Sequence, residues 1–313
     1  MKGKDLLSIM DLSSEEINVM LSDAVDMKQD KWHSILDKKV LALVFEKPSL
    51  RTRVSFEVAM RQMGGHTIYL SPAEVGLGKR ESARDVASVL GRFVDVIAAR
   101  TFSHETVAEL ARWADVPVIN ALDDIEHPCQ ALADLMTVYE KKGDLKGLTV
   151  AYIGDGNNVA NSLMLGCAMM GINFKIASPA GYNVPESILN AADEYAAGMD
   201  SSVFCTDKPA EAASEADVIY TDVWTSMGQE EESAKRREIF AGYKITTELM
   251  DKAKEDAVFM HPLPAHHGEE VTDEVLYSSA SVVFDQAENR MHMQKALLAQ
   301  MLGGLDVFFR RHK

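Results

Sequence analysis

A short run of hydroxyl and guanidinium side chains, Ser49-Leu50-Arg51-Thr52-Arg53, stands at the predicted start of a helix. It follows a buried strand expected over 39–45, and the helix is expected over 51–63. A helix N-terminus offers free N–H groups and a partial positive charge, and arginine presents a planar fork to an oxyanion. Arginine in a first turn opposes the helix dipole unless an anion is bound. The run therefore predicts a phosphate site, and the alternative is a helix cap with solvated arginines.

Two further groups of polar side chains follow later predicted strands. Arg100 follows the strand expected over 94–99, and His127-Pro128-Cys129-Gln130 follows the strand expected near 116–120. Pro128 suits the first position of a helix, so His127 and Gln130 should point toward one helix start. A single histidine is more often structural, but ligands of open α/β sheets collect beyond the carboxyl ends of strands. We therefore expect these groups to lie near the phosphate site.

The glycine-rich segment Gly154-Asp155-Gly156-Asn157-Asn158 invites a dinucleotide interpretation, and the sequence argues against it. Val159 stands where the third glycine of the fingerprint is required, and no acidic residue ends the strand expected over 174–177. A nucleotide-binding oxidoreductase is therefore a weak alternative.

Two later loops carry polar groups after strands. The segment Asp222-Val-Trp-Thr-Ser226-Met227-Gly228 is either a capped loop or a site where Asp222 and Ser226 bind a substrate ammonium. The segment His261-Pro262-Leu263-Pro264 begins a stretch whose histidines are spaced HxxxxHH, which matches no common zinc motif. We expect no metal site.

Short apolar runs alternate with amphipathic helical patterns along the chain. Such alternation predicts parallel sheets covered on both faces. The pattern starts again after the charged segment 141–147. The predicted fold is α/β, with two doubly wound parallel-sheet domains at 1–140 and 141–290 and a C-terminal helix, 291–313, packing back on the first. The other expected strands are 67–70, 148–153, 202–205, 218–220, 258–260 and 282–284, and the other expected helices are 81–92, 104–113, 157–170, 185–197 and about 288–309.

The composition limits the partners and the compartment. The 313 residues include 48 acidic and 32 basic side chains, a formal charge of −16, which argues against nucleic acid or an anionic membrane. The three cysteines are widely spaced and form no CxxC pair, which predicts a reducing compartment. No signal-like run and no apolar stretch of about 18 residues is present. We expect a cytoplasmic protein.

Taken together and in this order, Ser-x-Arg-Thr-Arg, the strand-ending arginine and His-Pro-x-Gln resemble the carbamoyl phosphate site of the aspartate/ornithine carbamoyltransferases, and the resemblance extends over essentially the whole chain. It implies that the run at 49–53 and Arg100 hold the phosphate, that His127, Arg100 and Thr52 polarise the carbamoyl oxygen, and that Gln130 lies near the carbamoyl nitrogen. The residues implied to be catalytic are Arg100, His127 and Arg290.

The second half resembles the ornithine branch of the family. The resemblance implies transfer to L-ornithine, giving L-citrulline and phosphate, with no cofactor. Asn158 would bind the acceptor's carboxylate, and Asp222, Ser226 and Met227 would bind the rest of its amino acid end. The Leu263 carbonyl would receive the carbamoyl NH₂. Pro262 stands where ornithine enzymes carry cysteine and matches the aspartate branch, so putrescine, aspartate and an acylated ornithine remain alternative acceptors.

The resemblance also implies a homotrimer or a multiple of trimers, in which the loop 76–82 contributes to a neighbouring site. Gly76 stands where relatives carry Gln or His, so either Lys79 or Arg80 makes the contact instead or the contact is missing. A catalytically inactive relative is the remaining alternative, and the intact set of arginines and His127 speaks against it.

Overall fold

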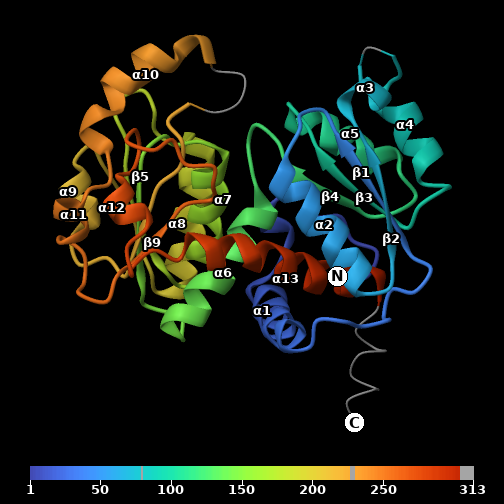
Figure 1. The fold of residues 1–313 in the computed structure, drawn as a ribbon, viewed down its shortest axis with the longest axis horizontal. Coiled ribbons are helices and arrows are strands. Elements are labelled where there is room, and N and C mark those ends of the chain that lie inside the picture. The colour runs from blue at the N-terminus through green and yellow to red at the C-terminus, as the bar shows by residue number, and fades with distance from the viewer. Residues whose placement is uncertain (79, 226–229, 304–313) are drawn as a thin grey trace. The chain divides into compact units, whose positions relative to one another are not determined.

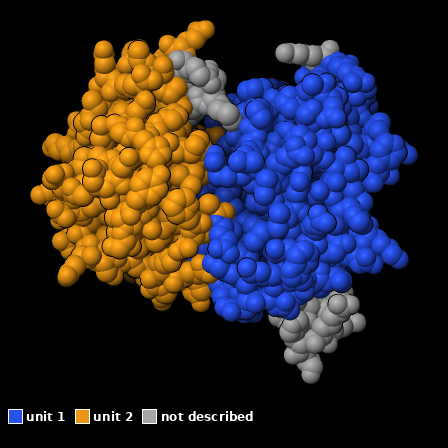
Figure 2. Space-filling model, in the orientation of Figure 1, with its two compact units in different colours: residues 1–136, 288–313 blue, residues 137–287 orange. Residues whose placement is uncertain are grey.

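The structure is a computed structural model that describes residues 1–78, 80–225 and 230–303 (Figure 1). The chain divides into two compact units (Figure 2): Met1–Met136 with Glu288–Lys313, and Thr137–Ala287. The divisions fall within two helices, α6 (Pro128–Lys142) and α13 (Val283–Leu302). None of the helices described is both long and apolar enough to cross a membrane.

The first unit is built on a four-stranded parallel sheet in the order β2-β1-β3-β4. The chain passes from β1 outward to β2 and then returns to the other side of β1, so the winding direction reverses between β1 and β3. Ligands of open α/β sheets bind beyond the carboxyl ends of the strands at such a switch point. The strands are β1 (Val40–Phe45), β2 (His66–Leu70), β3 (Val96–Arg100) and β4 (Val118–Leu122).

The helices of the first unit bury apolar faces against this sheet. Ala42 and Val44 of β1 and Ile97 of β3 share a core cluster with Val86 and Leu110 from two covering helices. The helices are α1 (Ser14–Gln29), α2 (Leu50–Gln62), α3 (Pro72–Val75), α4 (Ala83–Leu90) and α5 (His104–Trp113), together with the first part of α6, the later part of α13 and the 3-10 turn η1 (Ile9–Asp11).

The second unit repeats the plan with five parallel strands in the order β7-β6-β5-β8-β9, and its switch point lies between β5 and β8. The strands are β5 (Thr149–Ile153), β6 (Asn173–Ala177), β7 (Val203–Thr206), β8 (Val218–Tyr220) and β9 (Val258–Met260). The helices are α7 (Asn158–Met169), α8 (Glu186–Met199), α9 (Pro209–Ala213), α10 (Ser233–Phe240), α11 (Thr247–Met250) and α12 (Asp273–Leu276), with 3-10 turns η2 (Glu230–Glu232) and η3 (Ala241–Tyr243).

The predicted fold class is confirmed, because each unit has its own doubly wound parallel sheet and the later part of α13 belongs to the first unit. The predicted strand at 282–284 is wrong. Val282 donates its N–H to the carbonyl of Phe259 over 3.0 Å, but α13 begins at the next residue. By periodicity alone, a short apolar run fits a buried strand and a buried helix equally well. The tertiary structure here makes it the first turn of α13.

Candidate functional site

In the first unit, the carboxyl ends of β1 and β3 meet at the switch point. Phe45, the last residue of β1, is the register partner of Arg100, the last residue of β3. The chain beyond Phe45 leads through Lys47 into α2, so that the polar run at 49–53 starts at this edge of the sheet.

The start of α2 is tied to the last helix through a buried hydroxyl. Ser49 caps α2, and its hydroxyl donates to Thr52 Oγ1 over 3.1 Å. Arg290, on α13, donates from Nη2 to the same oxygen over 2.7 Å. Thr52 is fully buried, and its oxygen already accepts two hydrogen bonds, so its own proton can point toward a third group.

Several cations share this edge, of which Arg100 and Arg290 are buried and Lys47 and Arg51 are partly buried. Burial, with the charges of Arg290 and Arg51, lowers the pKa of Arg100 to about 9. Burial, with the charge of Arg100, lowers the pKa of Lys47 to about 8. Clustered like charges with little water are unfavourable, and a bound anion would relieve that cost. Sequence reasoning overlooked Lys47, although it lies in the loop that carries Ser49.

His127 is a neutral imidazole in this setting. Burial lowers its pKa well below the usual value, and the charges of Arg290, Arg100 and Lys47 lower it further. A neutral imidazole has one N–H donor and one acceptor, so His127 can polarise an oxygen without carrying a charge itself.

Buried polar atoms of Arg100 and Gln130 at this edge have no hydrogen-bond partner among the residues that the structure describes. They are Nε of Arg100 and Oε1 of Gln130. The amide nitrogen of Gln130 is engaged, since it donates to Asp134 Oδ1 over 2.8 Å. An unsatisfied buried donor or acceptor is costly, so an unpaired donor and an unpaired acceptor are suited to a polar ligand that offers both an oxygen and an N–H.

Two residues of the predicted phosphate set lie differently. Arg53 donates from Nε to Glu57 over 2.8 Å, and its guanidinium covers the ring of Tyr69 at 3.8 Å. Leu50 is 75% exposed, so only its backbone can take part in a helix-start site. The structure therefore gives Arg53 partners outside the cluster of Arg51, Arg100 and Arg290.

In the second unit, the carboxyl ends of β5 and β8 flank the other switch point. Asn157 caps α7 by accepting from the N–H groups of Val159 and Ala160, and its Nδ2 donates to Asp222 Oδ2 over 2.8 Å. Asp222 also accepts from the Val223 N–H over 2.8 Å, and burial raises the pKa of Asp222. The predicted Asn158 is the first residue of α7, at the same edge.

Arg236 of α10 ties two loops of this unit together. Its Nη1 donates to Asp155 Oδ2 over 2.7 Å and to the Trp224 carbonyl over 2.8 Å. Its guanidinium also lies 4.9 Å from the centre of the Tyr182 ring. Arg236 therefore holds the segment after Asp222 against the glycine-rich loop. The predicted residues Ser226 and Met227 of that segment, like Lys79, lie outside the described residues.

The turn after β9 is organised by His261. The Leu263 N–H donates to His261 Nδ1 over 2.9 Å, so Nδ1 is an acceptor and the proton of the neutral ring is on Nε2. That nitrogen lies 3.1 Å from Glu270 Oε1. Leu263 has a φ of 56°, which turns its backbone sharply at the predicted carbonyl site.

One group of side chains in the described chain has the spacing of metal ligands, namely His266, Glu269 and Glu270. Two of these residues already have partners. Glu269 pairs with Arg237 at 3.0 Å, and Glu270 accepts from the His266 N–H at 2.6 Å as well as contacting His261. We therefore assign no metal to this group.

Comparison with known proteins identifies the family. The carbamoyl-P binding domain of aspartate/ornithine carbamoyltransferase matches residues 4–140, and the Asp/Orn binding domain of the same family matches residues 146–301. The chain belongs to the aspartate/ornithine carbamoyltransferase family. The resemblance inferred from the sequence motifs is thereby confirmed.

Among members of this family, the chain is 55% identical over 300 residues to an ornithine carbamoyltransferase of Bacillus subtilis, covering 96% of this chain and 94% of that one. It is 50% identical over 313 residues to an ornithine carbamoyltransferase of Pyrococcus abyssi, with 99% of each chain covered. The solved ornithine carbamoyltransferase of Pyrococcus furiosus superposes with a TM-score of 0.94 at 50% identity, covering 97% of this chain and 98% of that one.

Within this carbamoyltransferase chain, local motifs located most of the polar groups that the structure places at the two switch points. In the first unit these are Ser49, Arg51, Thr52, Arg100, His127, Gln130 and Arg290, and in the second they are Asn158 and Asp222. Asn157 and Arg236 were missed. Their contribution depends on partners 65 and 81 residues away, which no local pattern reveals.

Proposed function

We propose that this chain transfers the carbamoyl group of carbamoyl phosphate to the side-chain amine of L-ornithine, giving L-citrulline and phosphate. One observation carries the proposal more than any other. It is the buried cationic edge where Arg290 donates to Thr52 beside Arg100, whose Nε has no hydrogen-bond partner in the described chain. The similarity to ornithine carbamoyltransferases over nearly the whole chain supports the same reaction.

The start of α2 would hold the phosphate. Ser49, the backbone of Leu50, Arg51 and Thr52 present hydroxyl, N–H and guanidinium donors at one helix N-terminus. We keep Arg53 in the proposed set as the member with least support, because Glu57 and Tyr69 already occupy its guanidinium.

The carbamoyl group would lie against the buried groups at the same edge. Arg100, the neutral His127 and the Thr52 hydroxyl would polarise its oxygen, and the Gln130 Oε1 would accept from its nitrogen. The neutral amine attacks the carbonyl carbon, a C–N bond forms, and the C–O bond to phosphate breaks through a tetrahedral intermediate. The amine loses one proton in the process. Arg100, Arg290 and His127 would act by preorganised electrostatics on the charge that develops on oxygen.

The second unit would hold the amino acid end of ornithine. Asp222, oriented by Asn157 and the Val223 N–H, would pair with the α-ammonium. We propose that Ser226 and Met227 assist Asp222, that Asn158 binds the carboxylate, and that the Leu263 carbonyl accepts from the carbamoyl NH₂. An aspartate acceptor would need an arginine for its second carboxylate. Arg236, the arginine tied to this loop, is already engaged by Asp155 and the Trp224 carbonyl.

The acceptor is tested by a colorimetric carbamoylation assay with L-ornithine, putrescine and L-aspartate. A site that pairs a carboxylate rejects an analogue lacking it, since buried partners are left unsatisfied. We expect L-ornithine to be carbamoylated faster than putrescine by orders of magnitude. Pro262→Cys should keep this preference and change the affinity for ornithine. Faster carbamoylation of putrescine or aspartate would overturn the acceptor and leave only carbamoyl transfer.

We further propose a homotrimer, or a multiple of trimers, in the cytoplasm. Exposed apolar side chains on α2 and on the edge strand β2, among them Leu50, Val54 and Ile68, support a protein contact on the first unit. Three free cysteines, Cys129, Cys167 and Cys205, agree with a reducing compartment. A fully active monomer in sedimentation would contradict the proposed assembly.

A further inference from the structure

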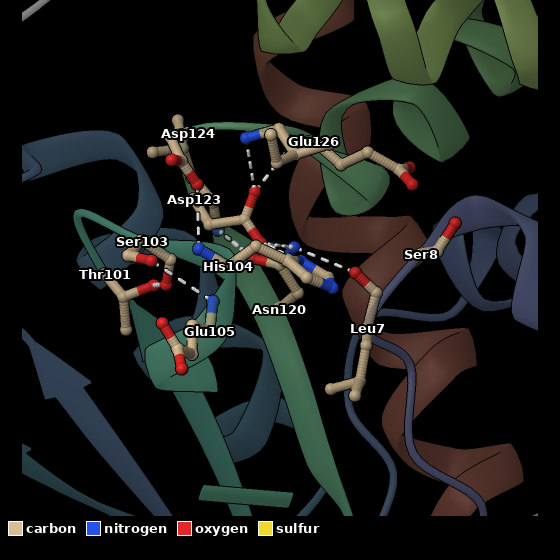
Figure 3. Close-up of polar contacts among 12 residues, drawn as sticks. Leu7, Ser8, Thr101, Ser103, His104, Glu105, Asn120, Asp123, Asp124 and Glu126 are labelled. Carbon is tan, nitrogen blue, oxygen red and sulfur yellow. Dashed lines mark hydrogen bonds and ion pairs between the residues drawn. The ribbon is translucent and has the colours of Figure 1, made fainter. Parts of the chain in front are cut away.

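A fully buried carboxylate, Asp123, lies in the loop between β4 and α6, four residues before His127. Figure 3 shows it at the centre of a group of polar contacts drawn from β4, this loop, the start of α5 and the N-terminal segment. A buried carboxylate is tolerated only when it is paired and hydrogen-bonded, so the fold needs the donors that surround Asp123.

One oxygen of Asp123 shapes the loop itself. Oδ1 accepts from the backbone N–H groups of Ile125 and Glu126 over 2.8 and 2.7 Å. The Asp123 N–H in turn donates to the Glu126 carbonyl over 3.1 Å. Glu126, the residue directly before His127, is therefore bonded to Asp123 twice. Its N–H donates to the Asp123 side chain, and its carbonyl accepts from the Asp123 N–H.

The other oxygen anchors the loop to its surroundings. Oδ2 accepts from Asn120 Nδ2 over 2.8 Å and lies 2.6 Å from His104 Nδ1 (Figure 3). Asn120 is fully buried and also donates to the Leu7 carbonyl over 2.9 Å. His104 is the first residue of α5, and its backbone N–H donates to Asp124 Oδ1 over 2.7 Å. The loop is thus held by β4, by α5 and by the N-terminal segment.

The carboxyl end of the loop is fixed as well. The buried Glu126 accepts from the Ile9 N–H over 3.1 Å, and the His127 carbonyl accepts from the Gln130 N–H over 3.0 Å, which begins α6. Small displacements of a polarising group lower the catalytic rate strongly, whereas the groups proposed to hold the phosphate lie mainly at the start of α2, a different element.

We propose that Asp123, held by His104 and Asn120, is a positioning residue for carbamoyl transfer that fixes the loop presenting His127. The inference rests on the proposed function, because His127 polarises the carbonyl oxygen only in that reaction. Asp123 acts through His127 and need not touch the substrate.

The test compares kcat for citrulline formation with the Kd of inorganic phosphate. Asp123→Ala removes the carboxylate that accepts from the Ile125 and Glu126 N–H groups and contacts Asn120 and His104, and we expect kcat to fall ~100-fold. The Kd of phosphate, measured at pH 6.5, should stay nearly unchanged. This pH lies below the pKa of Lys47, which is about 8 in the wild-type chain, where the charges of Asp123 and Asp124 raise it against the effect of burial. Asp123→Asn keeps an acceptor for the two backbone N–H groups and should restore kcat in part. A purely structural role would instead weaken phosphate binding and kcat together.

His104 supplies a second, milder test in case Asp123→Ala does not fold. His104→Leu removes one donor from Asp123 and should lower kcat, and His104→Gln, which can donate again, should recover it. Unchanged kcat in both Asp123→Ala and His104→Leu, or a parallel loss of phosphate affinity, would overturn the inference. A wild-type protein that carbamoylates no amine would instead defeat the proposed function, so the two failures are distinguishable.

Discussion

Arg290, on the last helix, donates a hydrogen bond of 2.7 Å to the hydroxyl of Thr52, 238 residues earlier in the chain. Both side chains are buried, so the contact is shielded from water. Through it, α13 brings a guanidinium to the start of α2, where the run at 49–53 lies. The charge of Arg290 also helps to lower the pKa of both Arg100 and His127.

Arg290→Gln should weaken carbamoyl phosphate binding strongly. Removing one partner of a buried charged contact typically costs about 2–5 kcal/mol. Loss of its charge should also raise the pKa of His127, because one of the cations that disfavour the imidazolium is gone. Calorimetry measures the binding, and an NMR titration of the His127 ring measures the pKa.

The matched comparison for this prediction is Arg53→Gln. Arg53 is about half exposed and bound to Glu57, so its loss should cost less affinity than the loss of Arg290. Equal losses would show that Arg53 reaches the phosphate, and an unaltered affinity in Arg290→Gln would remove Arg290 from the site.

The fold was predictable where local pattern and tertiary structure agree. The helix at 104–113 and the strands at 218–220 and 258–260 have the predicted ends. Helix α1 was not predicted, although Ser13 and Glu16 form a capping box that could have indicated its start. The strand predicted at 282–284 failed because the bridge to Phe259 is an isolated one made by Ser281, and α13 begins at Val283.

The site divides in the same way. Ser49, Arg51 and His127 could be inferred as site residues because each belongs to a motif formed by its neighbours along the chain. Lys47 is identified by its burial beside Arg100 after folding, and Arg236 by an aspartate 81 residues away. The domain limits inferred from composition, 1–140 and 141–290, remain a prediction about function. The compact units themselves divide at Met136 and Ala287.

Arg236→Lys should impair acceptor binding selectively. A lysine cannot reproduce a planar guanidinium that donates to Asp155 and the Trp224 carbonyl while covering Tyr182. The loop after Asp222 should therefore be held less firmly. We expect the KM for L-ornithine to rise about tenfold or more, which corresponds to roughly 1.4 kcal/mol per decade.

The affinity for carbamoyl phosphate should be unchanged in Arg236→Lys, because the groups proposed to hold its phosphate lie in the other unit. Arg237→Lys is the matched control, since Arg237 forms an exposed pair with Glu269 and such pairs contribute little. An ornithine KM that stays normal in Arg236→Lys, or rises equally in Arg237→Lys, would contradict the prediction.

Lys295 should make stability depend on pH. Its side chain is fully buried on α13 and donates to the carbonyls of Met27 and Lys31 over 3.0 and 3.1 Å. Burial lowers its pKa to about 8, and the charge of Lys31 contributes while Asp30 opposes the shift. The unfolded chain, with an ordinary lysine pKa near ~10.4, then binds the proton more tightly than the folded chain between these two values. The free energy of unfolding should therefore rise with pH across this window by up to about 3 kcal/mol. Below pH ~8 both states hold the proton, so Lys295 should cause no change of stability with pH there.

Lys295→Met isolates this contribution. Urea unfolding of wild type and variant at pH 7.5 and pH 10 should give a smaller rise in stability for the variant, because its buried side chain has no proton to lose. Lys47, whose pKa is also lowered to about 8, contributes in the same direction, so Lys47→Met should remove a separate share of the rise. The two lysines lie on different elements, α13 and the loop before α2, so their effects should add. Parallel stability curves for wild type and Lys295→Met would show that Lys295 keeps an ordinary affinity for its proton despite its burial.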